Sequence, residues 1–199
     1  MSEGHYFEAN PAVPSRPTQV ELALPDFRAQ LTADRGVFSA GGVDPGTLQL
    51  LRAVAEPGQP GHHLDLGCGY GPIACTIAHR SPESTVWAVD VNDRALALTA
   101  ANAKALAQPN VRAARPEQVP ADLTFVGIWS NPPIRIGKTA LHDMLQAWLP
   151  RLEPGATTWL VVQRHLGADS LAAWLVTEGW KVTRQGSKRG YRILRVEHA

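Results

Sequence analysis

Long apolar segments are missing from this sequence. Nowhere do about 18 uninterrupted apolar residues occur, the length that a helix needs to cross a bilayer. The first residues, Met1 to Phe7, also lack the basic segment followed by an apolar stretch that marks a secretory signal. These two absences predict a soluble protein that acts in the cytoplasm, without a membrane partner.

Cysteine is also scarce. The 199 residues include only two cysteines, Cys68 and Cys75, which are too few for a disulfide framework. Neither lies in a cluster of histidines and cysteines with zinc-ligand spacing, so we expect no structural metal. A nucleophilic cysteine needs a general acid beside it, whereas Cys68 lies in a glycine-rich turn. We therefore interpret Cys68 as a small packing residue.

The net charge of the chain is small. Nineteen lysines and arginines against 18 aspartates and glutamates give a formal net charge of +1 and a pI near 7.9. A strongly basic protein would indicate a nucleic-acid partner by its overall field, and this chain does not, so any RNA contact must come from a local patch. The length and a hydrophobic content of 44% predict one globular domain with a substantial core.

From residue 63 onward, short β-prone runs alternate with helical patterns. The expected strands are 63–66, 85–90, 111–114, 125–130, 157–163, 180–184 and 191–196. The expected helices are 47–55, 72–79, 93 to about 106, 138–149 and 168–178. This alternation predicts an α/β fold with helices on both faces of a mostly parallel, seven-stranded sheet. The short link 185–190 predicts that the last two strands form an antiparallel pair.

The first forty residues have a different character. Three prolines, Pro11, Pro14 and Pro17, precede an alternating stretch, Val20–Leu24, which resembles a short strand. We expect residues 1–40 to form an N-terminal extension whose short strands pack on the core, and residues 41–199 to form the main domain.

A glycine-rich loop, Asp65-Leu-Gly-Cys-Gly-Tyr-Gly71, follows the first strand of the alternating region. Its glycines, Gly67, Gly69 and Gly71, are spaced G-x-G-x-G, whereas the dinucleotide fingerprint is G-x-G-x-x-G, and no hydride-transfer site follows. Asp90 ends the second strand, where it can accept hydrogen bonds from both hydroxyls of a ribose. Gly67 and Gly69 would let the backbone approach the methionine part of an adenosine cofactor, and Asp65 would take its ammonium group.

Each of these residues also has a purely structural interpretation. Asp65 and Asp90 could cap helices or turns, and tight strand-to-helix turns need glycine in any case. Their joint placement favours the cofactor site.

The tetrapeptide Asn131-Pro-Pro-Ile134 follows the fourth strand and could hold an amine. A planar exocyclic amine attacks a methyl donor poorly because its lone pair is conjugated. If the Asn131 side-chain oxygen and the Pro132 carbonyl each accept one N–H, the lone pair is turned toward the methyl group. The alternative is an ordinary strand-ending turn. Together with the glycine loop, the tetrapeptide predicts methyl transfer to nitrogen.

Seven segments of the chain resemble the methyltransferase small domain family, in particular its RsmC-like ribosomal RNA guanine-N2 methyltransferases. The resemblance covers about residues 36 to 197 and is carried by Gly36–Ser39, Val43–Thr47, Leu64–Pro72, Val89–Asn92, Asn131–Arg135, Gly137–Lys138 and Lys188–Arg192. It implies a Rossmann-like class I methyltransferase fold with an antiparallel last strand, and S-adenosylmethionine as the methyl donor.

The resemblance also implies roles for particular residues. The catalytic loop would comprise Asn131, Pro132, Pro133 and Ile134. The cofactor would contact Phe38, Thr47, Asp65, Gly67, Cys68, Gly69, Gly71, Asp90, Val91 and Asn131. Arg135 and Lys138 flank the catalytic loop, and from that position, not from the resemblance, we expect them to bind the substrate.

The chain departs from the family pattern at several points. Larger members carry an additional N-terminal domain that helps to hold RNA, and many have an aromatic residue where this chain has Ile134. An aromatic ring could stack on a flipped base, so Ile134 would make a weaker apolar contact. Val126 replaces a usual acid, and Ala114 with Arg115 replaces the usual polar side chain near the adenine amine.

Several cations near the predicted loops could contact phosphates or could simply be solvated. They are Arg135, Lys138, Arg164, His165, Arg184, Lys188, Arg189 and Arg192. A homodimer would enlarge the RNA surface of so small a domain, although no heptad or exposed apolar stripe indicates one.

These observations predict an S-adenosylmethionine-dependent N-methyltransferase for the N2 amine of a guanine in 16S ribosomal RNA, with the RNA or the small ribosomal subunit as partner. A protein glutamine N5-methyltransferase is the nearest alternative, because its substrate is also a planar amide. A cofactor-binding partner subunit without activity is the other, and the intact Asn131-Pro132-Pro133 argues against it.

Overall fold

Seven strands form one sheet in the structure, a computed structural model that describes residues 13–199. The strands of the chain are β1 (Thr18–Ala23), β2 (Arg28–Ala33), β3 (His62–Leu66), β4 (Thr85–Val89), β5 (Val111–Ala114), β6 (Phe125–Ser130), β7 (Leu152–Gln163), β8 (Trp180–Lys188) and β9 (Tyr191–His198). The helices are α1 (Pro45–Ala53), α2 (Pro72–Arg80), α3 (Asp93–Ala105), α4 (Lys138–Trp148) and α5 (Ala168–Thr177).

The sheet order is β5-β4-β3-β6-β7-β9-β8. Strands β5 to β7 are mutually parallel, and β9 runs antiparallel to both of its neighbours, β7 and β8. The predicted mostly parallel sheet with an antiparallel last strand is confirmed. Its order reverses between β3 and β6, and the carboxyl ends of these strands therefore flank a crevice in which an open sheet binds ligands.

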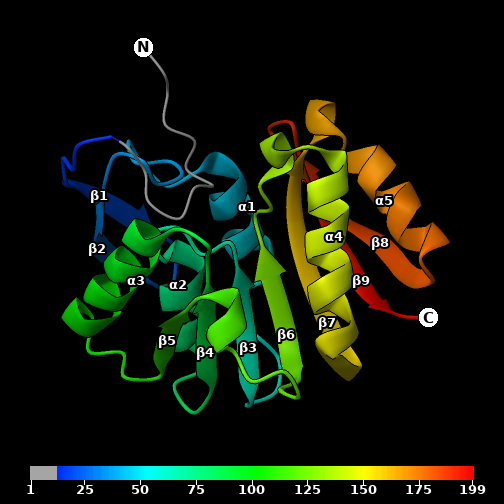
Figure 1. Cartoon of the computed structure of the whole chain (residues 1–199), viewed down its shortest axis with the longest axis horizontal. Coiled ribbons are helices and arrows are strands. Elements are labelled where there is room, and N and C mark those ends of the chain that lie inside the picture. The colour runs from blue at the N-terminus through cyan, green and yellow to red at the C-terminus, as the bar shows by residue number, and fades with distance from the viewer. Residues whose placement is uncertain (1–12) are drawn as a thin grey trace.

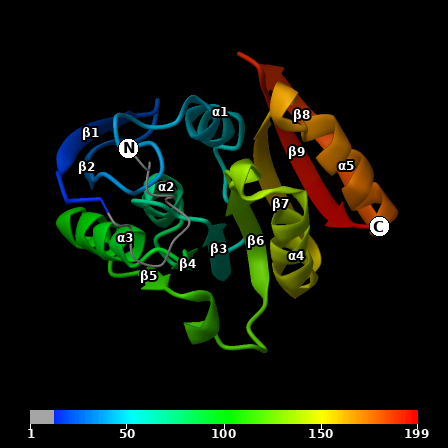
Figure 2. The same ribbon diagram turned by 45° about the horizontal axis from the view of Figure 1, so that its top comes forward.

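Helices cover both faces of the sheet, as predicted. Helices α1, α2 and α3 share a buried cluster with the β1–β2 hairpin, whereas α4 and α5 share a second buried cluster on the other face. Figures 1 and 2 show α2 and α3 beside the hairpin and α4 and α5 together over the β7–β8 half. No helix within residues 13–199 has both the length and the apolar character that a membrane span requires.

The N-terminal segment forms a β-hairpin, in which the sequence located only one of the expected short strands. The expected strand at Val20–Leu24 corresponds to β1, and β2 pairs with it antiparallel. Leu22 and Leu31 are fully buried in the cluster shared with α1 to α3. The side chain of Asn102 in α3 bonds both the N–H and the carbonyl of Thr32, which fixes the hairpin to the main sheet's helices. The predicted domain boundary at residue 40 stays a prediction, and Pro11 lies outside the described residues.

Two strand boundaries differ from the prediction by four residues or more, and both differences come from pairing. β7 begins at Leu152 because Leu152 is buried opposite Phe125, ahead of a register shift, so Pro154 and Gly155 do not end the strand. β8 continues to Lys188 across an irregularity at Arg184–Gly186. The link between β8 and β9 is therefore only Arg189–Gly190, both with positive φ, as two-residue hairpin turns require.

His63 makes the stability of the fold depend on pH. Its side chain is fully buried in β3, and burial lowers the pKa of His63 to about 4. Below about pH 6.5, the unfolded chain therefore binds a proton at His63 that the folded chain does not bind. The contribution of neutral His63 to the free energy of unfolding is fully present above that pH and is lost as the pH falls toward 4.

Between pH 7 and pH 5, we expect His63 to lower the free energy of unfolding by about 2 kcal/mol. Denaturant unfolding at both pH values measures the change, with His63→Phe as the comparison because phenylalanine does not titrate. The comparison also cancels Asp65 and Asp90, whose raised pKa values act in the opposite direction. An equal pH dependence in the two proteins would contradict this assignment.

Candidate functional site

A cavity of about 480 Å³ opens at the carboxyl ends of the parallel strands. It is lined by Val37, Phe38, Ser39, Asp44, Leu66, Gly67, Gly69, Val89, Asp90, Val91, Ala95, Pro116, Asn131, Pro132, Pro133, Ile134, Arg135, Met144, Trp148, Gln163, Leu166 and Tyr191. The two predicted motifs thus face one space. This is the place at which such sheets bind ligands.

The glycine loop forms a tight turn between β3 and α2. Gly67, Gly69 and Gly71 all have positive φ, and a Cβ on Gly71 would lie 3.0 Å from the Thr99 side chain. The N–H groups of Gly67 and Cys68 donate to the Val89 carbonyl, so the loop is fastened to the end of β4. The loop is therefore a rigid wall, with the backbone of Gly67 and Gly69 at the cavity surface.

Asp65 lies behind this wall. Its side chain is fully buried; Oδ2 accepts the N–H of Ala74 at 2.9 Å, and Oδ1 accepts no hydrogen bond within the described residues. Burial raises the pKa of Asp65 to about 8, opposed by the Ala74 N–H. The orphaned oxygen suits a donor supplied from outside the chain, and the predicted contact of Asp65 with an ammonium group stays a prediction.

Asp90 joins the glycine loop to the beginning of α3. Its Oδ2 accepts the N–H of Gly69 and its Oδ1 accepts the N–H of Asn92, each at 3.0 Å. Burial raises the pKa of Asp90, and these backbone hydrogen bonds oppose the rise. Each carboxylate oxygen keeps a second acceptor position, and the side chain faces the cavity. Asp90 can therefore accept both hydroxyls of a ribose.

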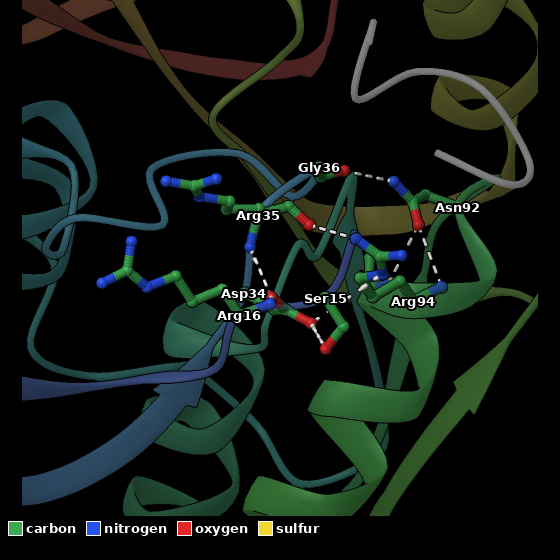
Figure 3. Close-up of polar contacts among 8 residues, drawn as sticks. Ser15, Arg16, Asp34, Arg35, Gly36, Asn92 and Arg94 are labelled. Carbon is green, nitrogen blue, oxygen red and sulfur yellow. Dashed lines mark hydrogen bonds and ion pairs between the residues drawn. The ribbon is translucent and has the colours of Figure 1, made fainter. Parts of the chain in front are cut away.

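Loop 34–39, which follows β2, closes the cavity beside Asp90. Figure 3 shows Asp34 at the centre of this region: it accepts hydrogen bonds from the Ser15 hydroxyl (2.6 Å) and from the N–H groups of Arg16 and Arg35. Burial raises the pKa of Asp34, but these hydrogen bonds and the charge of Arg94 outweigh burial and hold the pKa below its usual value.

Two further hydrogen bonds tie the same loop to α3. The Arg94 guanidinium donates to the Arg35 carbonyl at 2.6 Å, and the Asn92 side chain donates to the Gly36 carbonyl at 2.8 Å (Figure 3). They hold Val37 and Phe38 at the cavity wall. The N-terminal hairpin thus contributes directly to the site.

Removal of the Asp34 carboxylate by Asp34→Ala is expected to destabilise the fold by about 2 to 4 kcal/mol, because a buried network loses its acceptor. We also expect weaker binding of the adenosine cofactor, since Phe38 is no longer held at the cavity. Denaturant unfolding and calorimetric titration measure the two effects. Unchanged cofactor affinity in a folded Asp34→Ala protein would show that loop 34–39 does not contribute to the cofactor site.

Asn131 lines the cavity at the end of β6. The hydroxyl of Ser130 donates to the Leu66 carbonyl at 2.7 Å and fastens β6 to β3. Asn131 Nδ2 donates to Asp44 Oδ1 at 2.8 Å and to Thr47 Oγ1 at 3.0 Å. Asn131 Oδ1 accepts no hydrogen bond within residues 13–199, so an acceptor faces the cavity.

The rest of the predicted catalytic loop lines the cavity too. The Pro132 carbonyl accepts the Ile134 N–H at 2.8 Å and keeps a second lone pair. Pro133 approaches the glycine loop: a Cβ on Gly67 would lie 4.0 Å from its Cδ. The amine-binding and cofactor-binding motifs are therefore adjacent.

Some predicted residues lie outside the cavity wall. Thr47 contacts the Asn131 side chain, and Gly71 is the N-cap of α2. Cys68 is buried beside the Thr99 hydroxyl, and burial raises the pKa of its thiol. Lys138 is exposed at the first residue of α4. Their predicted ligand contacts stay predictions. Two of the predicted phosphate contacts, Arg184 and Arg192, form ion pairs with Asp169.

Sequence reasoning missed several residues that line the site. Asp44 and Tyr191 lay inside segments that carry the family resemblance, yet neither was given a role. Met144 and Trp148 were interpreted only as the apolar face of α4. Pro116 follows Arg115, whose guanidinium is paired with Asp93 and not placed in the cavity. Of these residues, Asp44 and Tyr191 had a usable signal in the sequence.

Comparisons with known proteins identify relatives of this chain. The Bacillus subtilis (strain 168) protein YbxB, described as uncharacterized, is 34% identical over 200 residues, which cover 99% of both chains. Ribosomal RNA small subunit methyltransferase C of Pseudomonas putida (strain KT2440) is 39% identical over 131 residues, or 64% of this chain and 37% of that protein. This chain therefore spans less than two fifths of that relative.

The fold agrees with that of a solved methyltransferase. The structure of the Thermus thermophilus 16S rRNA N2 G1207 methyltransferase RsmC in complex with AdoMet and guanosine matches with a TM-score of 0.79 and 24% identity, over 95% of this chain and 52% of that one. A model of the methyltransferase small domain family matches residues 28–195. The chain therefore belongs to the methyltransferase small domain family and is an S-adenosylmethionine-dependent methyltransferase.

Proposed function

We propose that this protein methylates the exocyclic N2 amine of a guanine in the RNA of the small ribosomal subunit. The observation that carries the proposal is the orientation of Asn131: its NH₂ group is bound by Asp44 and Thr47, and its oxygen faces the cavity beside the glycine loop. The names of the RsmC relatives, and the guanosine in the Thermus thermophilus structure, support guanine as the acceptor.

The residues present fit S-adenosylmethionine. Asp90 would hold the ribose hydroxyls, Gly67 and Gly69 would leave room for the backbone to approach the methionine part, and the orphaned Asp65 Oδ1 would meet the ammonium group. Val37 and Phe38 would close the pocket. When bound, the cofactor supplies an electrophilic methyl group on a sulfonium.

The catalytic loop acts on the acceptor amine by orientation. Asn131 Oδ1 and the Pro132 carbonyl each accept one N–H of the amine, and the nitrogen lone pair is then turned toward the glycine loop, where the methyl donor is held. Two fixed acceptors favour the pyramidal, partly cationic nitrogen of the transition state over the planar ground state. No strong base would be required before attack: the N–C bond would form as the S–CH₃ bond breaks, with the electron pair left on a neutral thioether sulfur, and the extra proton on nitrogen would then pass to water.

Local cations would hold the RNA. Arg135 lines the cavity and Lys138 is exposed at the first residue of α4, which supports the proposal that both contact phosphates on either side of a flipped guanine. Ile134 would give the base an apolar contact. A homodimer would add further RNA surface, and sedimentation of the protein with and without RNA would detect it.

Digestion of the labelled product with ribonuclease or protease shows whether the methyl acceptor is RNA or protein. Purified protein is incubated with radiolabelled S-adenosylmethionine and with ribosomal subunits and lysate from cells that lack it, and the label is then treated with ribonuclease or protease. The proposal predicts ribonuclease-sensitive label that Asn131→Ala does not produce. Protease-sensitive label would instead identify a protein glutamine methyltransferase. No label despite measured cofactor binding would indicate a partner subunit without activity of its own.

A further inference from the structure

We propose that Asp44 is a positioning residue that sets the orientation of the Asn131 carboxamide, an inference that rests on the proposed transfer to an amine. Asp44 Oδ1 accepts three N–H groups: Gly46 N at 2.7 Å, Thr47 N at 3.0 Å and Asn131 Nδ2 at 2.8 Å. A single oxygen thus joins the beginning of α1 to the catalytic loop, 87 residues further along the chain.

The direction of the amide decides whether Asn131 can bind an amine. A carboxamide presents either its oxygen or its NH₂ group, and only the oxygen can accept an N–H. An ionised carboxylate accepts hydrogen bonds and donates none, so Asp44 admits only the orientation in which Nδ2 faces α1. Thr47 Oγ1 accepts the second N–H at 3.0 Å, so both N–H groups of the carboxamide are bound on the α1 side. In the flipped orientation, the NH₂ group would face the N–H groups of the acceptor.

Asp44 is itself held in place. It is the N-cap of α1, and the helix continues with Pro45, which has no N–H to compete for the carboxylate. Tyr191 packs on Gly46 so closely that a Cβ there would lie 2.6 Å from the Tyr191 ring. Because α1 cannot shift toward β9, the carboxylate stays within reach of Asn131.

Three substitutions separate this role from helix capping. Asp44→Ser keeps a good N-cap, but its shorter side chain does not reach Asn131. Asp44→Asn keeps an acceptor at the same place, because the N–H groups of Gly46 and Thr47 require its oxygen there. Thr47→Val removes the second acceptor and leaves the shape nearly unchanged.

The transfer assay is performed with the acceptor identified above, together with a titration of S-adenosylmethionine. We expect Asp44→Ser to lower kcat by about tenfold, and Asp44→Asn to stay within about threefold of the unmodified protein, with cofactor affinity unchanged in both. In an Asn131→Ala background, Asp44→Ser should lower kcat by less than about twofold, because the residue it acts through is gone. An equal fall in both backgrounds, or a matching loss of cofactor affinity, would overturn the proposal.

Nuclear magnetic resonance of the side-chain amides gives an answer that needs no acceptor. The Asn131 NH₂ protons, identified by their absence from Asn131→Ala, should exchange slowly with solvent in the unmodified protein and in Asp44→Asn. They should exchange faster in Asp44→Ser, and fastest in Asp44→Ser with Thr47→Val. Unchanged exchange in the folded double variant would overturn the role of Asp44, whatever the acceptor proves to be. Failure of the proposed function alone would leave these exchange rates as expected.

Discussion

Asn131→Ala is expected to lower methyl transfer at saturating cofactor by at least tenfold, since removal of one preorganised hydrogen-bonding group of an active site lowers kcat by about 10² to 10³. The variant loses the side-chain acceptor that faces the cavity, so the amine is held by the Pro132 carbonyl alone and its lone pair is no longer fixed. Cofactor affinity should change little, because the glycine loop and Asp90 are untouched.

Single-turnover transfer rates and calorimetric titration measure these two quantities. Gln146→Ala is a matched control: it also removes a carboxamide, but one on α4 that is bonded to Glu178 and does not line the cavity. A fully active Asn131→Ala protein would remove Asn131 from the mechanism. A large loss of cofactor affinity in that variant would assign Asn131 to the cofactor and not to the amine.

Asp90→Ala is expected to weaken the binding of S-adenosylmethionine by a factor of about 10² or more. Each charge-assisted hydrogen bond to a ribose hydroxyl contributes about 1.5 to 3 kcal/mol, and two are lost together. The variant also leaves the N–H groups of Gly69 and Asn92 without their acceptor, so the glycine loop and α3 lose a common anchor. Both the lost ribose contacts and the lost anchor lower the affinity for S-adenosylmethionine.

Calorimetric titration of the folded variant measures this loss. Asp93→Ala is the control, since it removes a nearby carboxylate that is partly exposed, paired with Arg115 and absent from the cavity wall. The affinity of Asp93→Ala for S-adenosylmethionine should stay within about threefold of that of the unmodified protein, because surface ion pairs contribute little to stability. If the two variants bound the cofactor equally well, Asp90 would not hold the ribose.

The fold could be predicted because its signals are local. Apolar strands alternating with helices specify a parallel sheet, and a tight link such as that before Tyr191 specifies an antiparallel pair. The strand β2 was missed because its partner, not its own pattern, makes it a strand: Arg28–Ala33 pairs residue for residue with β1. The early start of β7 depends in the same way on Leu152 meeting Phe125.

The residues of the site also differ in whether local sequence or a distant partner determines their place. The glycine loop, Asp90 and Asn131 are visible in the sequence because turn geometry and chemistry require those residue types at those places. The contact between Asp44 and Asn131 is not visible, since it joins residues 87 apart whose separate sequence contexts, a helix cap and a strand end, each look complete. The anchoring of loop 34–39 to Asn92 and Arg94 is hidden for the same reason.

The most direct test of the account is the chemical identity of the methylated product. Small ribosomal subunits from cells that lack the protein are incubated with the purified protein and labelled cofactor, and the RNA is digested to nucleosides and separated beside standards. The account predicts label in N2-methylguanosine, and none when Asn131→Ala is used. Label in another nucleoside, or in methylated glutamine of a protein, would contradict it.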